Sequence, residues 1–167
     1  MWKYALWAAA VPVAAVILVF AVGLLLPRDH VASAEAVVPA APETVAGLVR
    51  DVEAQPRWRG AVTAIEVRER RPDGLRYVEH SGDEAILFDF SEEQAGRRFR
   101  AAIADPGLPF GGAWTIEVAP EAGATRVRIE ERGFVTHPVY RFFATLVFGH
   151  KGTIKAYLAD LQRAAGR

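Results

Sequence analysis

The sequence predicts an α+β protein in which a curved antiparallel β-sheet wraps around a long C-terminal α-helix, preceded by one transmembrane helix. Three observations support this fold class. Residues 1–27 carry a single charged side chain. Residues 62–133 alternate apolar and polar side chains with the period of β-strands, and residues 138–161 repeat apolar side chains at helical spacing. We therefore divide the chain into a transmembrane anchor, residues 1–27, and one domain, residues 28–167.

The opening segment has the length and composition of a membrane-spanning helix. No charged side chain occurs in residues 5–26, and a helix of that length extends about 33 Å, against about 30 Å for the hydrocarbon core of a bilayer. Trp2, Tyr4 and Trp7 lie beside Lys3, as is typical of the membrane–water interface. The sequence therefore predicts attachment to a membrane through residues 5–26.

Two other interpretations of this segment stay open. A cleaved signal peptide has a shorter apolar stretch, and cleavage after Ala34 would remove half of the strand predicted for residues 31–38. A buried core helix keeps a polar face, which this segment lacks. The flanking charges, Lys3 and Arg28, orient the anchor only weakly; we favour a domain outside the cytoplasm.

A short helix and a series of strands follow. Pro42 and Glu43 suit the first turn of a helix, and apolar residues then recur at helical spacing up to Val52. The residues that alternate form six further strand-like segments, separated by turn residues: 62–70, 75–81, 85–91, 97–104, 112–119 and 125–133. Such alternation predicts an antiparallel sheet with one covered and one solvated face.

The last segment supplies the cover. Pro138 suits the start of a helix, and an apolar stripe continues from there to Leu161. Gly149 and Gly152 interrupt the stripe, which predicts a kink. A helix of about 25 residues would be about 37 Å long and could lie across a curled sheet.

Composition excludes several functions. The chain has 20 basic and 20 acidic residues, and without Lys3 the domain is slightly negative, which argues against a general nucleic-acid binder. There is no cysteine, so disulfides and thiolate chemistry are excluded. The four histidines do not show metal-binding spacing, and we predict neither a metal nor a cofactor; they are His30, His80, His137 and His150.

Three polar residues are weak candidates for acid–base catalysis. Glu131 shares its strand face with Val127 and Ile129, so its carboxylate should point toward the covered side of the sheet. Glu79 and His80 are adjacent, so only one of them can face inward. A carboxyl group in such a position could act as a general acid or orient a ligand hydroxyl, but a solvated or rim position is the simpler interpretation for all three.

Four stretches in this order resemble a known superfamily. They are Val38-Pro39-Ala40-Ala41-Pro42-Glu43-Thr44-Val45, Gln55-Pro56-Arg57-Trp58, Asp105 to Trp114, and Glu131-Arg132-Gly133-Phe134-Val135 continuing to Pro138. Residues 30–165 are thereby similar to the START-like superfamily, also called SRPBCC, in its polyketide cyclase/dehydrase and lipid-transport branch. The resemblance implies a helix-grip fold with a hydrophobic cavity between sheet and helix. The residues we expect at that cavity are Trp58, Phe88, Phe90, Phe99, Trp114, Glu131, Phe142 and Leu146.

Three functions are compatible with these features. We favour membrane-anchored binding, or transport, of a small hydrophobic or lipid-like ligand. The second is a polyketide cyclase or dehydratase that uses Glu131, Glu79 or His80 as acid and base. The third is a protein-interaction module, but the outer face of the sheet mixes arginine with glutamate, whereas an interaction surface of this kind should expose an apolar patch.

Overall fold

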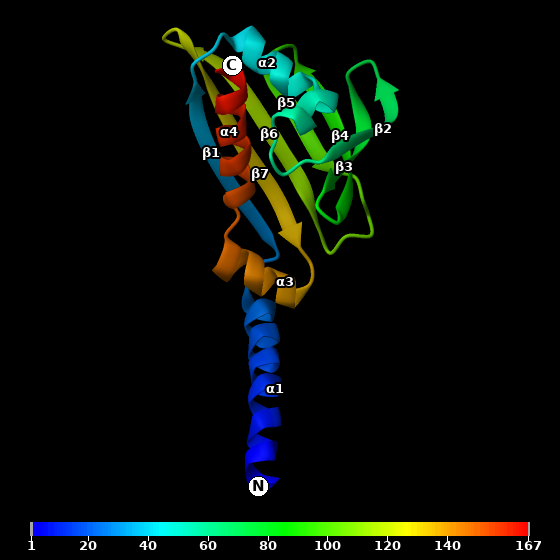
Figure 1. Ribbon diagram of the computed structural model, residues 1–167, viewed down its shortest axis with the longest axis vertical. Helices are drawn as coiled ribbons and strands as arrows, with labels where there is room; N and C mark the ends of the chain where they lie inside the picture. Colours follow the sequence, from blue (N-terminus) through cyan, green and yellow to red (C-terminus); the bar gives the residue numbers. More distant parts are fainter. Residues whose placement is uncertain (1, 167) are drawn as a thin grey trace.

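The computed structural model describes the backbone of residues 2–166 and the side chains of residues 13–166 (Figure 1). In chain order the elements are α1 (Trp2–Leu25), β1 (Asp29–Val38), α2 (Pro42–Arg50), the 3-10 helix η1 (Val52–Arg57), β2 (Ala64–Arg71), β3 (Gly74–Ser81), β4 (Glu84–Gln94), β5 (Arg98–Ile103), β6 (Phe110–Glu121), β7 (Ala124–Val135), α3 (Pro138–Phe143), the π-helix η2 (Ala144–Phe148) and α4 (Gly152–Ala165).

One antiparallel sheet of seven strands forms the body of the domain. The strand order is β1-β7-β6-β5-β4-β3-β2, so the first strand pairs with the last. Helix α4 packs along β1 on one face of the sheet, and α2 lies against α4, β6 and β7 (Figure 1). The predicted α+β class, the seven strands and the C-terminal helix are therefore confirmed.

The predicted alternation of buried and exposed side chains is clearest on β7. Val127 and Ile129 are fully buried on the inner face, whereas Arg126 and Arg128 are exposed on the outer one. The core fills the space between the inner face, α2 and α4. Its largest fully buried side chains are Phe99, Ile129, Ile154 and Leu161.

The outer face of the sheet carries ion pairs. Arg76 and Asp89 are direct cross-strand partners on β3 and β4 and form two hydrogen bonds of 2.9 and 2.8 Å. The hydrogen bonds from Arg76, despite partial burial, hold the pKa of Asp89 below its usual range. Arg126 and Glu121 form a second exposed pair. This pattern of paired charges is the one that the sequence predicts for a solvated face.

The C-terminal helix is shorter than predicted. The expectation of one helix of about 25 residues is wrong, because Gly149 adopts φ +69° and separates α3 and η2 from α4. Helix α4 has 14 residues and is therefore about 21 Å long. The α3–η2 segment, residues 138–148, lies beyond the sheet against α1 (Figure 1). The predicted interruption at Gly149 is confirmed.

Helix α1 is joined to the domain at its C-terminal end. A Cβ atom on Gly23 would overlap the carbonyl group of Pro138, so α1 packs on α3 backbone to backbone. Arg141 donates hydrogen bonds to the carbonyl oxygens of Gly23 and Leu26. Among the residues with described side chains, no helix is long and apolar enough to cross a membrane. The predicted membrane-spanning segment, residues 5–26, includes residues 5–12, whose side chains lie outside the described part of the chain. The finding therefore concerns only the remainder of that segment.

Replacing Phe99 should test the core most sharply. Its side chain is fully buried and its ring stacks on Phe90 at 6.0 Å, so Phe99→Ala should lower the free energy of unfolding by about 3–5 kcal/mol. The control Phe148→Ala removes a ring that is 76% exposed and should change that free energy by less than about 0.5 kcal/mol. Urea denaturation followed by tryptophan fluorescence measures both, and equal effects would contradict this description of the core.

Candidate ligand cavity

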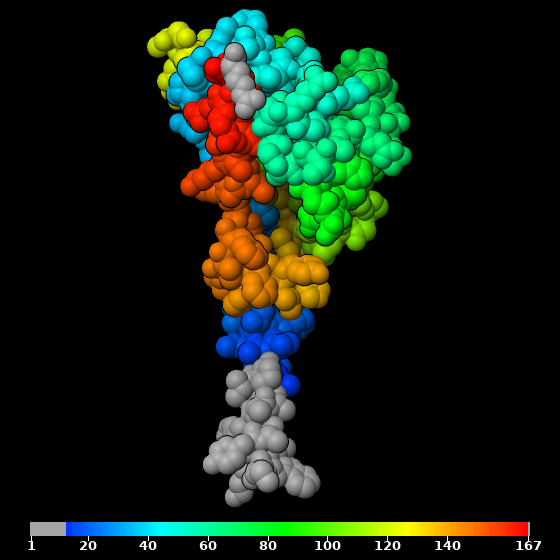
Figure 2. All heavy atoms as spheres, viewed as in Figure 1, coloured from blue at the N-terminus to red at the C-terminus, as the bar shows by residue number. Residues whose placement is uncertain are grey.

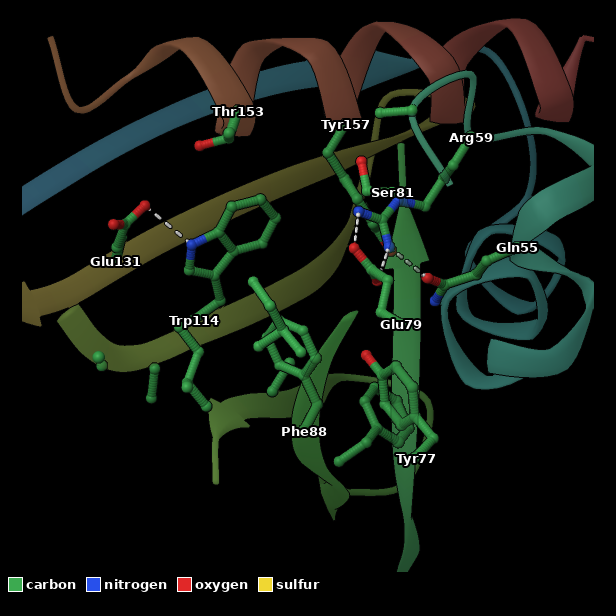
Figure 3. Close-up of a pocket in the computed structure, with 18 of the residues that line it drawn as sticks. Gln55, Arg59, Tyr77, Glu79, Ser81, Phe88, Trp114, Glu131, Thr153 and Tyr157 are labelled. Carbon is green, nitrogen blue, oxygen red and sulfur yellow. Dashed lines mark hydrogen bonds and ion pairs between the residues drawn. The ribbon is translucent and has the colours of Figure 1, made fainter. Parts of the chain in front are cut away.

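A cavity of about 340 Å³ lies between the inner face of the sheet and α4 (Figure 3). This volume is near the small end of the range of about 300–1,000 Å³ that small-molecule sites occupy. The apolar part of its wall comes from β4, β5 and β6, whose strand alternation turns these side chains inward: Ile86, Phe88, Phe90, Ala101, Ile103, Trp114 and Ile116. Most of the wall would therefore present hydrocarbon groups to a bound ligand.

An ion pair forms the first polar group in the wall. Arg59, just after η1, donates hydrogen bonds of 2.6 and 3.2 Å to the two carboxylate oxygens of Glu79 on β3. It donates a third, of 2.8 Å, to the side-chain oxygen of Gln55. The Arg59 and Glu79 side chains are only 15% and 14% exposed, so the pair is largely shielded from solvent. A fork of this kind fixes both side chains against the wall.

Tyr157 on α4 lies beside this pair. The guanidinium carbon of Arg59 is 5.2 Å from the centre of its ring, and the residue is 5% exposed. Tyr157 lines the cavity (Figure 3), and its buried hydroxyl has no hydrogen-bond partner among the described residues. Burial raises the pKa of Tyr157 far above its usual value, so the hydroxyl keeps its proton and can donate. Trp58, whose ring packs on Tyr157, also has an unpartnered N–H but lies outside the lining.

The second polar group is centred on Glu131. One carboxylate oxygen is 3.0 Å from Nε2 of His30 on β1, and the other accepts a hydrogen bond of 2.8 Å from Nε1 of Trp114 on β6. The His30 ring can reach Glu131 because it passes over Gly133, where a Cβ atom would lie 2.7 Å from that ring. The His150 ring stacks on His30 at 3.7 Å. The two polar groups lie on opposite sides of Trp114 (Figure 3).

The candidates for acid–base chemistry separate clearly. Glu79 and Glu131 line the cavity, whereas His80 points to the outer face, 3.8 Å from Glu66. The strand register decides between the adjacent Glu79 and His80, because Tyr77, Glu79 and Ser81 share the inner face of β3. Glu131 faces inward, as the alternation on β7 predicts.

The residues expected to bind ligand are only partly brought together. Phe88, Phe90, Trp114 and Glu131 line the cavity. Four others lie outside its lining, in two places. Trp58 and Phe99 belong to the packed core, Phe99 directly behind Phe90, and Phe142 and Leu146 lie on the α3–η2 segment beyond the end of the sheet.

Periodicity and motifs carry no direct signal for three of the polar lining residues, Gln55, Arg59 and Thr153. Arg59 follows η1 and donates both to Gln55 within that helix and to Glu79, which is 20 residues further along the chain. Thr153 lies in the first turn of α4, the helix that covers the sheet (Figure 3). Tyr157 was visible only as one aromatic member of an apolar stripe. Within the described residues, no group of three or more His, Asp or Glu side chains could hold a metal ion.

Comparison with known proteins places the fold in a family. Residues 29–166 match the family described as "Polyketide cyclase / dehydrase and lipid transport". The match covers most of the chain, and the protein belongs to this family, within the START-like, or SRPBCC, superfamily. A search of curated proteins finds no match.

Several solved structures share the fold at low sequence identity. A START superfamily protein from Mycobacterium smegmatis is 17% identical, with a TM-score of 0.65 over 82% of this chain and 97% of that chain. The Zhui aromatase/cyclase from a Streptomyces species is 11% identical, with a TM-score of 0.68 over 83% and 94%. Norcoclaurine synthase from Thalictrum flavum is 13% identical, with a TM-score of 0.65 over 86% and 90%. At these identities the similarity concerns the fold alone.

The partly buried ring of His150 should make stability depend on pH. Burial, and to a smaller extent the neighbouring His30, lower the pKa of His150, against an opposing effect of Glu131. The unfolded chain therefore binds a proton more readily than the folded one, so folding free energy is lost as the pH falls through about 6.5 toward the folded pKa. His150→Gln should abolish this part of the decline between neutral and mildly acidic pH, measured by urea denaturation. His80→Gln is the control, and a decline that persists in His150→Gln would contradict the assignment.

Proposed function

We propose that this protein binds a small, mainly apolar molecule bearing a hydroxyl or carbonyl group, while α1 tethers it to a membrane. The observation that carries the proposal is the hydroxyl of Tyr157, which has no hydrogen-bond partner among the described residues, in a cavity whose wall is mainly apolar. A buried hydroxyl without a partner costs about 1–3 kcal/mol. A ligand oxygen at this position would remove that cost, and the Arg59–Glu79 pair beside it offers further polar contacts.

The size of the cavity is consistent with moderate affinity. Burying about 300 Å² of apolar ligand surface yields about 7.5 kcal/mol at about 25 cal/mol per Å². Association costs reduce this gross value, which supports dissociation constants in the micromolar range or weaker. Such affinity suits a carrier, because a carrier must release its ligand as well as bind it.

The tether rests on the exposed surface of α1. Within its described part, most apolar side chains point into solvent, among them Val16, Ile17 and Leu18 at 63–65% exposure. Packing against the domain involves α3 near the end of the helix. Continuous apolar exposure of this kind is typical of contact with lipid. The uncharged length of residues 5–26 supports a spanning segment, and we propose that the domain lies outside the cytoplasm.

Tyr157→Phe should distinguish a polar contact from simple burial. The probes are 2-naphthol, which carries one hydroxyl, and naphthalene, which carries none. Losing one hydrogen bond of about 1 kcal/mol should weaken 2-naphthol binding about fivefold, while naphthalene binding should be unchanged because the apolar wall is intact. Isothermal titration calorimetry measures both. Absence of binding by either probe, or equal weakening of both, would contradict the proposed site.

A second candidate function is a cyclase or dehydratase acting on a polyketide-like substrate. The observation that favours it is the placement of Glu131, whose carboxylate is held at the cavity wall by His30 and Trp114. The imidazole of His30 could donate a proton to the carboxylate of Glu131 or accept one from it. Glu79 is the other candidate in the lining and is engaged by Arg59.

Glu131→Gln tests this second function. Glutamine keeps an oxygen for the Trp114 N–H but cannot act as an acid or base, so turnover of an aromatic polyketide precursor should fall at least a hundredfold. The dissociation constant of the same precursor should change little, because the cavity wall is preserved. Product analysis by liquid chromatography measures turnover, with His80→Gln as the control. Unchanged turnover in Glu131→Gln would remove Glu131 from the mechanism.

A further inference from the structure

The α3–η2 segment exposes a cluster of large apolar side chains. Five of its residues are exposed, and Phe148 is the most exposed of them at 76%: Tyr140, Phe143, Leu146, Val147 and Phe148. None of the residues of this segment is buried. Scattered apolar residues on a surface need no explanation, but a contiguous group marks a site of interaction. In Figure 2 this segment forms the base of the domain, directly beside the described part of α1.

The position of this cluster relative to α1 is fixed by direct contacts. The backbone of Gly23 touches Pro138 at the start of α3, and Arg141 donates to the carbonyl oxygens of Gly23 and Leu26. An arginine at the C-terminal carbonyls of a helix also interacts favourably with the helix dipole. The cluster therefore lies level with the end of α1, where a membrane-spanning helix would leave the hydrocarbon core.

The stretch of chain that contains the α3–η2 segment carries basic but no acidic side chains. No acidic residue occurs between Glu131 and Asp160, whereas basic side chains occur at Arg132, Arg141, Lys151 and Lys155. Basic side chains close to a membrane are attracted to anionic headgroups, and tyrosine rings prefer the interface between headgroups and hydrocarbon. Along this stretch of the chain apolar exposure and basic side chains occur together, as in interfacial membrane helices, while the acidic residues Asp29 and Glu84 at the same end of the sheet belong to other strands.

The open end of the cavity lies at this same end of the sheet. Strand β3 ends and β4 begins at Ser81 and Glu84, which line the cavity together with Phe110 at the start of β6. The antiparallel pairing places these positions at the end of the sheet where β1 begins, next to α1. Figure 2 shows a hollow between the α3–η2 segment, α4 and the strands β3 and β4.

The geometry points to the α3–η2 segment as an interfacial element that inserts its apolar side chains into the headgroup layer of the bilayer crossed by α1. This inference rests on the proposed tether. The bound surface would hold the mouth of the cavity close to the membrane, so that an amphipathic ligand could pass between bilayer and cavity with little exposure to water.

A site-specific fluorophore tests the inference in the full chain. Because the protein has no cysteine, Phe148→Cys can carry a single environment-sensitive NBD group. The control is Val37→Cys, which is 48% exposed on β1 near the end of the sheet away from α1. Both proteins are reconstituted into vesicles of equimolar phosphatidylcholine and phosphatidylglycerol. We expect a blue-shifted emission, quenched by nitroxide-labelled lipid, at position 148 and aqueous emission without quenching at position 37.

The outcomes separate this inference from the tether. If the proteins float with the vesicles but the label at position 148 behaves like the one at 37, α1 is anchored and the interfacial role of α3–η2 is overturned. If neither protein floats with the vesicles, the proposed tether fails and the inference fails with it. Quenching at position 148 alone supports both.

Discussion

The pairing of β1 with β7 is the interaction on which the rest of the structure depends. Its register runs from Asp29 opposite Phe134 to Val38 opposite Thr125, and it joins the first strand of the domain to the last. The pairing brings His30 within reach of Glu131 across Gly133. It also places the end of α1 beside the start of α3. Strand β1, which follows α1, begins at the end of the sheet where β7, which precedes α3, finishes.

Gly149 determines how much of the sheet is covered. With φ +69°, it ends the helical run before the chain continues into α4, so a cover of only 14 residues lies on the sheet. Helix α4 therefore covers only part of the sheet, and Figure 2 shows a hollow between α4, the α3–η2 segment and strands β3 and β4. The same break directs the α3–η2 segment outward, where its apolar side chains are exposed. The conformation of Gly149 thus affects both the cover over the cavity and the exposure of the apolar side chains on the α3–η2 segment.

Periodicity predicts the features that depend on local sequence. The alternation along β7 correctly placed Glu131 on the inner face, and the glycines around His150 indicated the helix break. Periodicity does not predict contacts that depend on strand register and chain folding. His30 and Glu131 are 101 residues apart in sequence, and Arg59 lies in the loop after η1 whereas Glu79 lies on β3. The division of aromatic residues between core and cavity was equally inaccessible, since Phe90 and Phe99 stack on each other and only Phe90 lines the cavity.

The polar groups of the cavity differ in how well the fold satisfies them. Glu131 and the Arg59–Glu79 pair are bonded to other protein groups, so the folded chain stabilises them without a ligand. Within the part of the chain that the structure describes, Tyr157 has no such partner, and phenylalanine would fill the same space without the cost of a buried hydroxyl, about 1–3 kcal/mol. That cost is substantial against a total stability of about 5–15 kcal/mol for a domain. Among the polar groups of the cavity, the hydroxyl of Tyr157 is therefore the one that gains most from the proposed ligand.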